Sequence, residues 1–136
     1  MDPATPNQRA AFETTLDAAL VDAFAALSGD RNPIHMDAGK AAALGFGGRV
    51  VHGMLLSALV SRLVGENLPG GNVLLLSVKI GFHRPALVGD RVRVEGTVAS
   101  ESHSARAIEV AFTISRGGEL LAKGSALARR MGAPTP

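Results

Sequence analysis

The segment from Val51 to Glu66 constrains the fold more than any other part of the chain, because it is apolar on nearly every side of a helix. The spacing of its apolar residues predicts a helix, and a helix without a hydrated face is one that other elements bury. Small residues recur every four positions along it, at Gly53, Ser57, Ser61 and Gly65. Residues four apart share a helix face. We therefore expect a second backbone or a ligand to pack closely against that side.

The second half of the chain, residues 72–130, alternates between apolar and polar residues with the period of two that is typical of strands. Four strands are predicted, at Val73–Phe82, Val92–Val98, Ile108–Ile114 and Leu120–Arg129. Gly117-Gly118 and residues 88–91 provide turn signals between successive strands. Strands joined by short turns pair antiparallel. The predicted fold class is therefore α+β, with an antiparallel sheet wrapped around the long central helix.

The first half of the chain is expected to be helices and loops within the same domain. Apolar spacing predicts a helix over Thr15–Leu27, and Asp37 is expected to cap a short helix that runs through Ala43. No linker rich in Pro, Gly or Ser divides the chain, so residues 1–136 are interpreted as a single domain. Residues 1–10 and 132–136 are expected to be loose termini.

Composition excludes several classes of protein. The 136 residues include no cysteine, which removes disulfides, thiolate nucleophiles and Cys-based metal sites from consideration. The net charge of +2 comes from scattered arginines, and aromatic residues make up only 4%, a pattern that argues against nucleic-acid binding. The longest uncharged apolar run, residues 50–61, is too short to span a bilayer, and the polar N-terminus resembles no signal peptide. We expect a cytoplasmic protein with no membrane partner.

The stretch S-G-D-R-N-P-I-H-M-D, residues 28–37, is the most informative for chemistry. Asp30 and His35 lie on a loop that Pro33 stiffens and that Asn32 can hold in a tight turn. A carboxylate and an imidazole that face one water molecule can polarise it and shuttle its protons. The alternative is that Asp30 caps a turn and His35 is a satisfied polar residue. No metal is expected, because His35 and His52 lack the close paired spacing of a zinc site.

The start of the central helix, Val51-His52-Gly53-Met54, is a second candidate feature. The first amides of a helix have no internal partner, and the positive end of the helix dipole favours negative charge. Because Gly53 has no side chain, a substrate oxygen could reach its N–H, and this would make an oxyanion hole for a thioester carbonyl. The alternative is a helix start that needs glycine for close packing. His52 is interpreted as a capping or positioning residue.

The stretch F-A-A-L-S-G-D-R-N-P-I-H-M-D, residues 24–37, resembles the hydratase signature of MaoC-like, (R)-specific enoyl-CoA hydratases. Later motifs of that family follow in the expected order, with V-H-G-M at 51–54, L-P-G at 68–70 and F-H-R-P-A-L-V-G-D at 82–90. The resemblance covers roughly residues 12–130. It implies a hot dog fold and a homodimer whose two sheets join edge to edge.

The resemblance also implies roles for individual residues. Asp30 and His35 match the pair that holds the catalytic water, although which of them moves which proton stays open. Gly53 matches the residue whose N–H faces the thioester carbonyl, and Ser61 matches a serine that lines the active site. Asn32, Pro33 and His52 would support the structure of the site.

The implied activity is reversible syn hydration of trans-2-enoyl-CoA to (R)-3-hydroxyacyl-CoA. The implied enzyme is a lyase without a metal or redox cofactor, and coenzyme A enters only as part of the acyl-CoA substrate. Two other functions stay open. One is a hot dog dehydratase or thioesterase that acts on an acyl-carrier-protein or other acyl thioester. The other is a non-catalytic subunit that binds acyl thioesters, against which the presence of Asp30, His35 and Gly53 argues.

Overall fold

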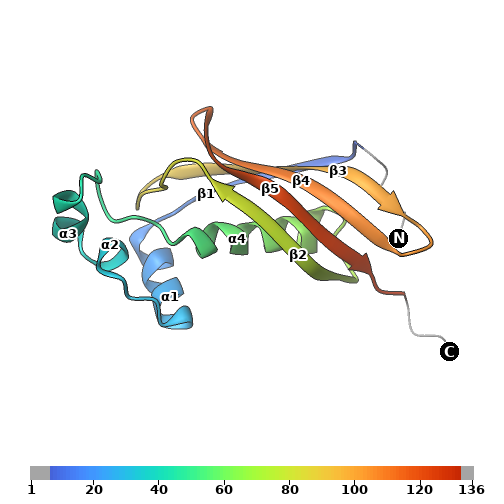
Figure 1. The fold of residues 1–136 in the computed structure, drawn as a ribbon, viewed down its shortest axis with the longest axis horizontal. Helices are drawn as coiled ribbons and strands as arrows, with labels where there is room; N and C mark the ends of the chain where they lie inside the picture. Colours follow the sequence, from blue (N-terminus) through green and yellow to red (C-terminus); the bar gives the residue numbers. More distant parts are fainter. Residues whose placement is uncertain (1–6, 133–136) are drawn as a thin grey trace.

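In the computed structural model, which describes residues 7–132, a five-stranded antiparallel sheet curls around one helix (Figure 1). The strands are β1 (Arg9–Thr15), β2 (Val73–Phe82), β3 (Arg91–Ser102), β4 (Ala107–Arg116) and β5 (Glu119–Arg130), in the spatial order β1-β3-β4-β5-β2. The helices are α1 (Ala18–Ser28), α2 (Pro33–Met36), α3 (Ala38–Ala43), α4 (Gly53–Arg62) and a π-helical turn, η1 (Leu63–Asn67). The expected α+β class, with a sheet around a central helix, is confirmed.

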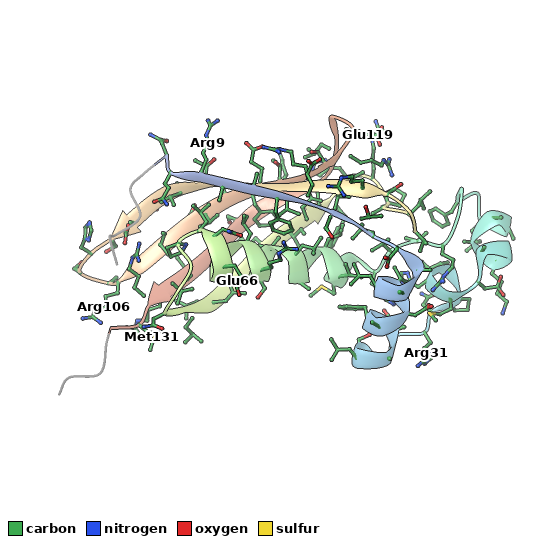
Figure 2. The ribbon with its side chains drawn as sticks, turned by 180° about the vertical axis from the view of Figure 1, so that it is seen from behind. Arg9, Arg31, Glu66, Arg106, Glu119 and Met131 are labelled. Atoms are coloured by element: carbon green, nitrogen blue, oxygen red, sulfur yellow. The ribbon has the colours of Figure 1, made fainter. Side chains whose placement is uncertain are left out.

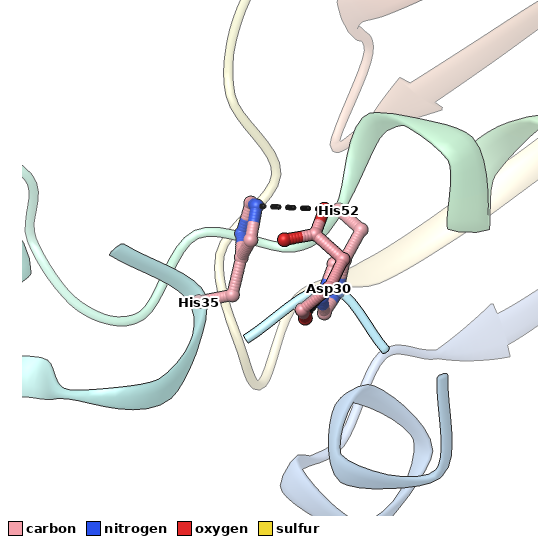
Figure 3. Close-up of side chains that lie close together, drawn as sticks. All are labelled: Asp30, His35 and His52. Carbon is pink, nitrogen blue, oxygen red and sulfur yellow. Dashed lines mark hydrogen bonds and ion pairs between the residues drawn. The ribbon is translucent and has the colours of Figure 1, made fainter. Parts of the chain in front are cut away.

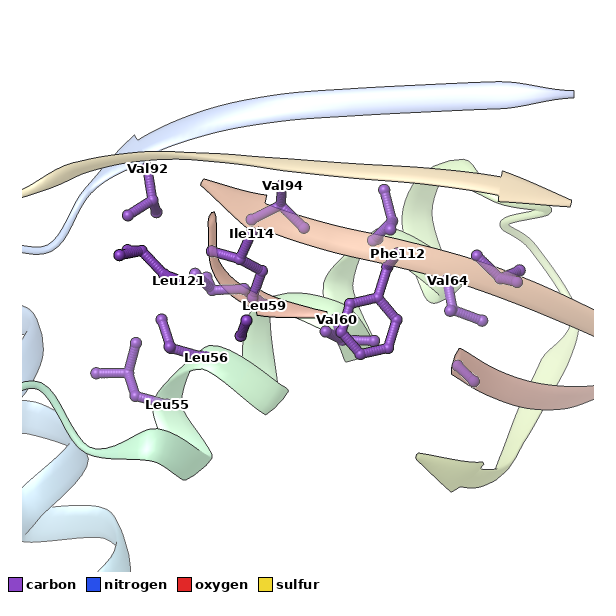
Figure 4. Packing of buried hydrophobic residues seen from close by; sticks show 14 of the residues in the cluster. Leu55, Leu56, Leu59, Val60, Val64, Val92, Val94, Phe112, Ile114 and Leu121 are labelled. Atoms are coloured by element: carbon purple, nitrogen blue, oxygen red, sulfur yellow. The ribbon is translucent and has the colours of Figure 1, made fainter. Parts of the chain in front are cut away.

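The alternating pattern of the strands produces the core between the sheet and α4. Every second side chain of β4 is buried, from Ile108 to Ile114, and so are the inward valines of β3. They pack against Leu55, Leu59 and Val60 of α4 (Figure 4). Fully burying an aliphatic side chain of this size stabilises the fold by about 1.5–3 kcal/mol. This layer of contacts therefore holds α4, and with it the first turn of the helix, in a fixed place beneath the sheet.

The sequence did not predict the first strand, β1. The strand β1 pairs with β3 from Arg9↔Thr97 to Thr15↔Arg91, so Arg9 and Ala10 are not part of a loose terminus as expected. Its seven residues alternate between exposed and half-buried, because β1 is an edge strand with one face on the core. Arg9 projects outward from this edge (Figure 2). Residues 1–6 and 133–136, the rest of the expected loose termini, lie outside the described residues.

The prediction that α4 has no hydrated face is wrong for the single chain. Met54, Ala58 and Ser61 are exposed, because the sheet covers only one side of the helix. The exposed strip faces the outer edge strand β2, whose Leu74, Leu75 and Leu76 are also exposed. Between α4 and β2 lies an open groove of about 720 Å³. Within residues 7–132, no helix is long and apolar enough to cross a membrane.

The turn before β3 is closed by a charged cluster. The Asp90 carboxylate accepts a hydrogen bond from the Leu87 N–H at 2.8 Å and pairs with Arg116 at 2.5 Å. Hydrogen bonds to Asp90 and then to Glu119 raise the pKa of Arg116 above its usual value, so this guanidinium stays charged. The cluster fixes the segment between β2 and β3 that forms one wall of the site described below.

Gly124 marks the closest approach between two strands. A Cβ added to Gly124 would lie 1.8 Å from the carbonyl oxygen of Lys79 on β2. We expect Gly124→Ala to lower the free energy of unfolding by about 1–3 kcal/mol or more, because a backbone clash in a paired sheet cannot be relieved by a side-chain movement. Chemical denaturation measures the change.

Ser125→Ala, on the neighbouring residue of β5, is the matched control and should leave stability within about 0.5 kcal/mol of the wild type. A Gly124→Ala variant as stable as this control would show that the two strands can separate without cost.

Candidate active site

The loop that carries Asp30 is shaped by local hydrogen bonds. Gly29 ends α1 in the left-handed conformation, with φ of 78°, which turns the chain sharply after the helix. The Ser28 hydroxyl then accepts a hydrogen bond from the Asp30 N–H at 3.1 Å. Asn32 caps α2 by accepting from the Ile34 N–H at 3.2 Å, and Pro33 occupies the first position of that helix. These short-range constraints direct Asp30 and His35 toward the same space.

Asp30 and His35 lie next to each other, as Figure 3 shows. The Oδ1 atom of Asp30 accepts a hydrogen bond from the Asn32 N–H at 3.2 Å. Its other oxygen, Oδ2, faces the Nε2 atom of His35 at 3.9 Å. The aspartate side chain is half exposed, whereas the His35 side chain is 10% exposed. The carboxylate can therefore meet water while the imidazole is held in the protein.

The backbone fixes the orientation of the His35 ring. Its Nδ1 atom lies 2.6 Å from the carbonyl oxygen of Val50. A carbonyl only accepts, so Nδ1 carries the hydrogen and the neutral ring presents a bare Nε2 toward Asp30. When the ring is neutral, the pair therefore presents two acceptors to one small space.

Arg49 is a part of the site that the sequence analysis missed. Its Nε donates to the backbone carbonyl of His35 at 2.6 Å, and its Nη2 donates to Asp22 on α1 at 2.5 Å. The side chain is largely buried. Arg49 therefore links α1 to the short helix that carries His35. No spacing rule would have found it, because its partners lie 14 and 27 positions away.

A pocket of about 340 Å³ opens beside this pair. Its lining includes His35 and Gly53, together with Val50, Val51, Leu56, Phe82, His83, Arg84, Pro85 and Ala86. Gly53 is the first residue of α4, so its N–H has no intrahelical acceptor. The ring of Phe82 packs on the side of Gly53 where a Cβ would lie, and a Cβ there would be 2.9 Å from Phe82 Cζ. The absence of a side chain at Gly53 allows this close approach of the Phe82 ring, and Gly53 forms part of the pocket wall.

Ser61 lies apart from the other predicted site residues. It is exposed, two turns beyond Gly53 along α4, which is about 12 Å at the rise of an α-helix. It is not among the residues that line the pocket at His35. Of the small residues that recur along α4, Gly53 lines this pocket and Ser61 lies beyond it.

The group Asp30, His35 and His52 brings three potential metal ligands within 4.8 Å of one another. The two imidazole rings, however, are stacked with an interplanar angle of 26°. The lone pairs of ring nitrogens lie in the ring planes, so those of stacked rings run side by side and do not converge on one ion. The geometry favours proton transfer over metal coordination.

A larger hollow of about 540 Å³ lies on the outer face of the sheet, over Arg9, Thr113 and Lys123. Neither Asp30, His35 nor Gly53 lines it. The smaller pocket is the one that His35 and Gly53 line, with the Asp30 carboxylate next to His35.

Known proteins share this sequence and fold. The sequence profile of the MaoC like domain matches residues 3–117. The (R)-specific enoyl-CoA hydratase of Aeromonas caviae is 38% identical over 124 residues, which are 90% of this chain and 92% of that protein. The 3-hydroxybutyryl-CoA dehydratase of Methylorubrum extorquens is 38% identical over 106 residues, 78% of this chain and 68% of that protein.

Among solved structures, the (R)-hydratase from A. caviae matches with a TM-score of 0.91 at 36% identity, over 96% of this chain and 100% of that one. The profile match extends over most of the chain, and the relatives align over most of their own length. The chain therefore belongs to the MaoC-like domain family.

Proposed function

We propose that this chain is an (R)-specific enoyl-CoA hydratase, a lyase that reversibly adds water to trans-2-enoyl-CoA to give (R)-3-hydroxyacyl-CoA. One observation carries the proposal. Asp30 Oδ2 lies 3.9 Å from Nε2 of His35, and His35 lines a pocket whose wall also includes Gly53. The names of the relatives from A. caviae and M. extorquens agree with it, since hydration and dehydration are the two directions of one reaction.

The separation of the pair fits a bridging water. At 3.9 Å the two atoms are too far apart for a direct hydrogen bond. One water can instead donate a hydrogen to each of them at about 2.8 Å. Both hydrogens of that water are then engaged, so a lone pair of its oxygen is left to attack the β carbon of the enoyl group.

The electrons and protons balance without a cofactor. The water oxygen forms a bond to the β carbon, the double-bond electrons move toward the thioester carbonyl, and one water proton passes to the Asp30–His35 pair. The same proton then joins the α carbon, and the carbonyl is restored. Because the hydroxyl group and the proton both come from the side of the pair, they add to one face of the double bond. No oxidation state changes, so the reaction calls for no redox group.

The start of α4 would stabilise the enolate. Negative charge develops on the thioester oxygen as water adds, and the N–H of Gly53 can donate to it. The dipole of α4 adds positive potential at the same place. Leu56 and the valines at 50 and 51 give the pocket an apolar wall suited to an acyl chain.

Asp30→Asn tests this role directly. The amide keeps the shape of the side chain but presents no basic carboxylate, so we expect kcat for crotonyl-CoA hydration to fall by about 10²–10⁴. Loss of the enoyl absorbance measures the rate. Glu109→Gln, which removes an exposed carboxylate on β4, is the control and should match the wild type.

A thiol-reactive dye in the same assay separates hydration from thioester hydrolysis, because only hydrolysis releases coenzyme A. Near wild-type hydration by Asp30→Asn, or release of thiol in step with substrate loss, would refute the mechanism. Binding of crotonyl-CoA without turnover by the wild type would instead support a non-catalytic binding subunit.

We also propose that two copies of the chain pair through β2. This strand is ten residues long, forms an edge of the sheet and exposes three consecutive leucines, at 74–76. Edge strands of monomers are normally shortened, charged or covered, and a long apolar edge invites pairing. The apolar groove between β2 and α4 continues that surface.

Leu76→Lys places a charge on this edge and should shift the protein from dimer to monomer, as measured by light scattering after gel filtration. Leu44→Lys, at a more exposed leucine beyond α3, is the control and should leave the mass unchanged. A dimer that survives the charge at position 76 would place the contact elsewhere.

A further inference from the structure

His52 is buried behind the catalytic pair. Its side chain is almost fully buried, and it is not among the residues that line the pocket. Its Nε2 atom lies 2.9 Å from the backbone carbonyl oxygen of Asp30, so Nε2 carries the hydrogen and donates it. Its Nδ1 atom is buried and has no hydrogen-bond partner among the described residues. One nitrogen is thus committed to the Asp30 backbone, and the other is cut off from water and substrate.

The ring of His52 is also held by its neighbours. It stacks on the His35 ring, with centroids 3.9 Å apart and an interplanar angle of 26°. The ring of Phe24 contacts it at a centroid distance of 4.9 Å and a tilt of 48°. A ring packed between two others has little freedom to move.

The three groups that the reaction needs come from three separate segments. Asp30 lies between α1 and α2, His35 lies in α2, and Gly53 begins α4. His52 touches all three, through the hydrogen bond to the Asp30 carbonyl, the stack on His35 and its peptide bond to Gly53. No cap hydrogen bond to α4 occupies its side chain.

We propose that His52 is a positioning residue that sets the distance between the Asp30–His35 water site and the Gly53 amide. This inference rests on the proposed hydratase function. The water must lie opposite the β carbon while the thioester oxygen lies at the amide, so the distance between these two places must match the substrate. A misplacement of about 1 Å in such an arrangement can cost about 10²-fold in rate.

His52 is not itself a catalytic residue. A catalytic base needs an exchangeable nitrogen within reach of the substrate, and neither nitrogen of His52 meets that condition. Loss of positioning should therefore lower kcat, because it reduces stabilisation of the transition state more than it reduces substrate binding.

Two substitutions in the full chain separate the contacts of His52. His52→Phe keeps an aromatic ring to stack on His35 but leaves the Asp30 carbonyl without its donor. We expect kcat for crotonyl-CoA to fall about 10²-fold, with KM within about threefold of the wild type. His52→Gln carries an amide N–H near the place of Nε2 and should recover kcat to within about tenfold of the wild type.

A double-mutant cycle with Asp30→Asn distinguishes positioning from general support of the fold. If His52 acts through the water site, His52→Phe should lower kcat by less than about threefold once the Asp30 carboxylate is gone. Equal losses in both backgrounds would overturn the inference, and so would a His52→Phe enzyme with wild-type kcat. If the Phe variant does not fold, His52→Gln is measured in the same two backgrounds. A loss of kcat that disappears when Asp30→Asn is also present supports positioning. An equal loss of kcat in both backgrounds overturns it.

The same assay distinguishes failure of the role of His52 from failure of the proposed hydratase activity. A wild-type chain that leaves crotonyl-CoA unchanged overturns both. An active wild type with unaffected His52 variants overturns only the role of His52.

Discussion

The hydrogen bond between His35 Nδ1 and the Val50 carbonyl joins the two halves of the site. It connects a loop whose shape is set by local turns to the segment that leads into α4. It also selects the ring tautomer, and with it the direction in which a proton can move. The distance between the Asp30 carboxylate and Nε2 follows from where this ring is held, and His35 also lines the pocket beside Gly53.

The core explains why Val50 and the start of α4 are rigid enough for this purpose. The helix is pinned by side chains from every strand around it, and Val50 itself bridges to Leu87 in the segment between β2 and β3. That segment is held in turn by the Asp90–Arg116 pair. The packing of the sheet therefore holds the Val50 carbonyl, the His35 imidazole and the Gly53 amide in fixed positions. Precise placement of this kind is what acid–base and oxyanion catalysis need.

Much of this architecture follows from local patterns. The period of the strands, the Gly117-Gly118 hairpin and the cap at Asp37 each reflect neighbours a few residues apart, and all are confirmed. The strand β1 was missed because a short edge strand with one half-buried face carries a weak alternation, and it forms only where β3 offers it a partner. The exposed strip on α4 was missed for the opposite reason. Its residues are apolar or small, but the sheet of a single chain does not reach around them.

For the site, the sequence by itself determined which groups are available: a carboxylate and an imidazole on a proline-stiffened loop, and a glycine at the start of a helix. Turn chemistry and helix ends depend on residues within a few positions, so these could be read directly. Only the tertiary structure decided that Val50 orients His35, that Arg49 binds its backbone and that His52 stacks on its ring. Those contacts join residues 14 to 17 positions apart, and the packing of α4 under the sheet is what brings them together.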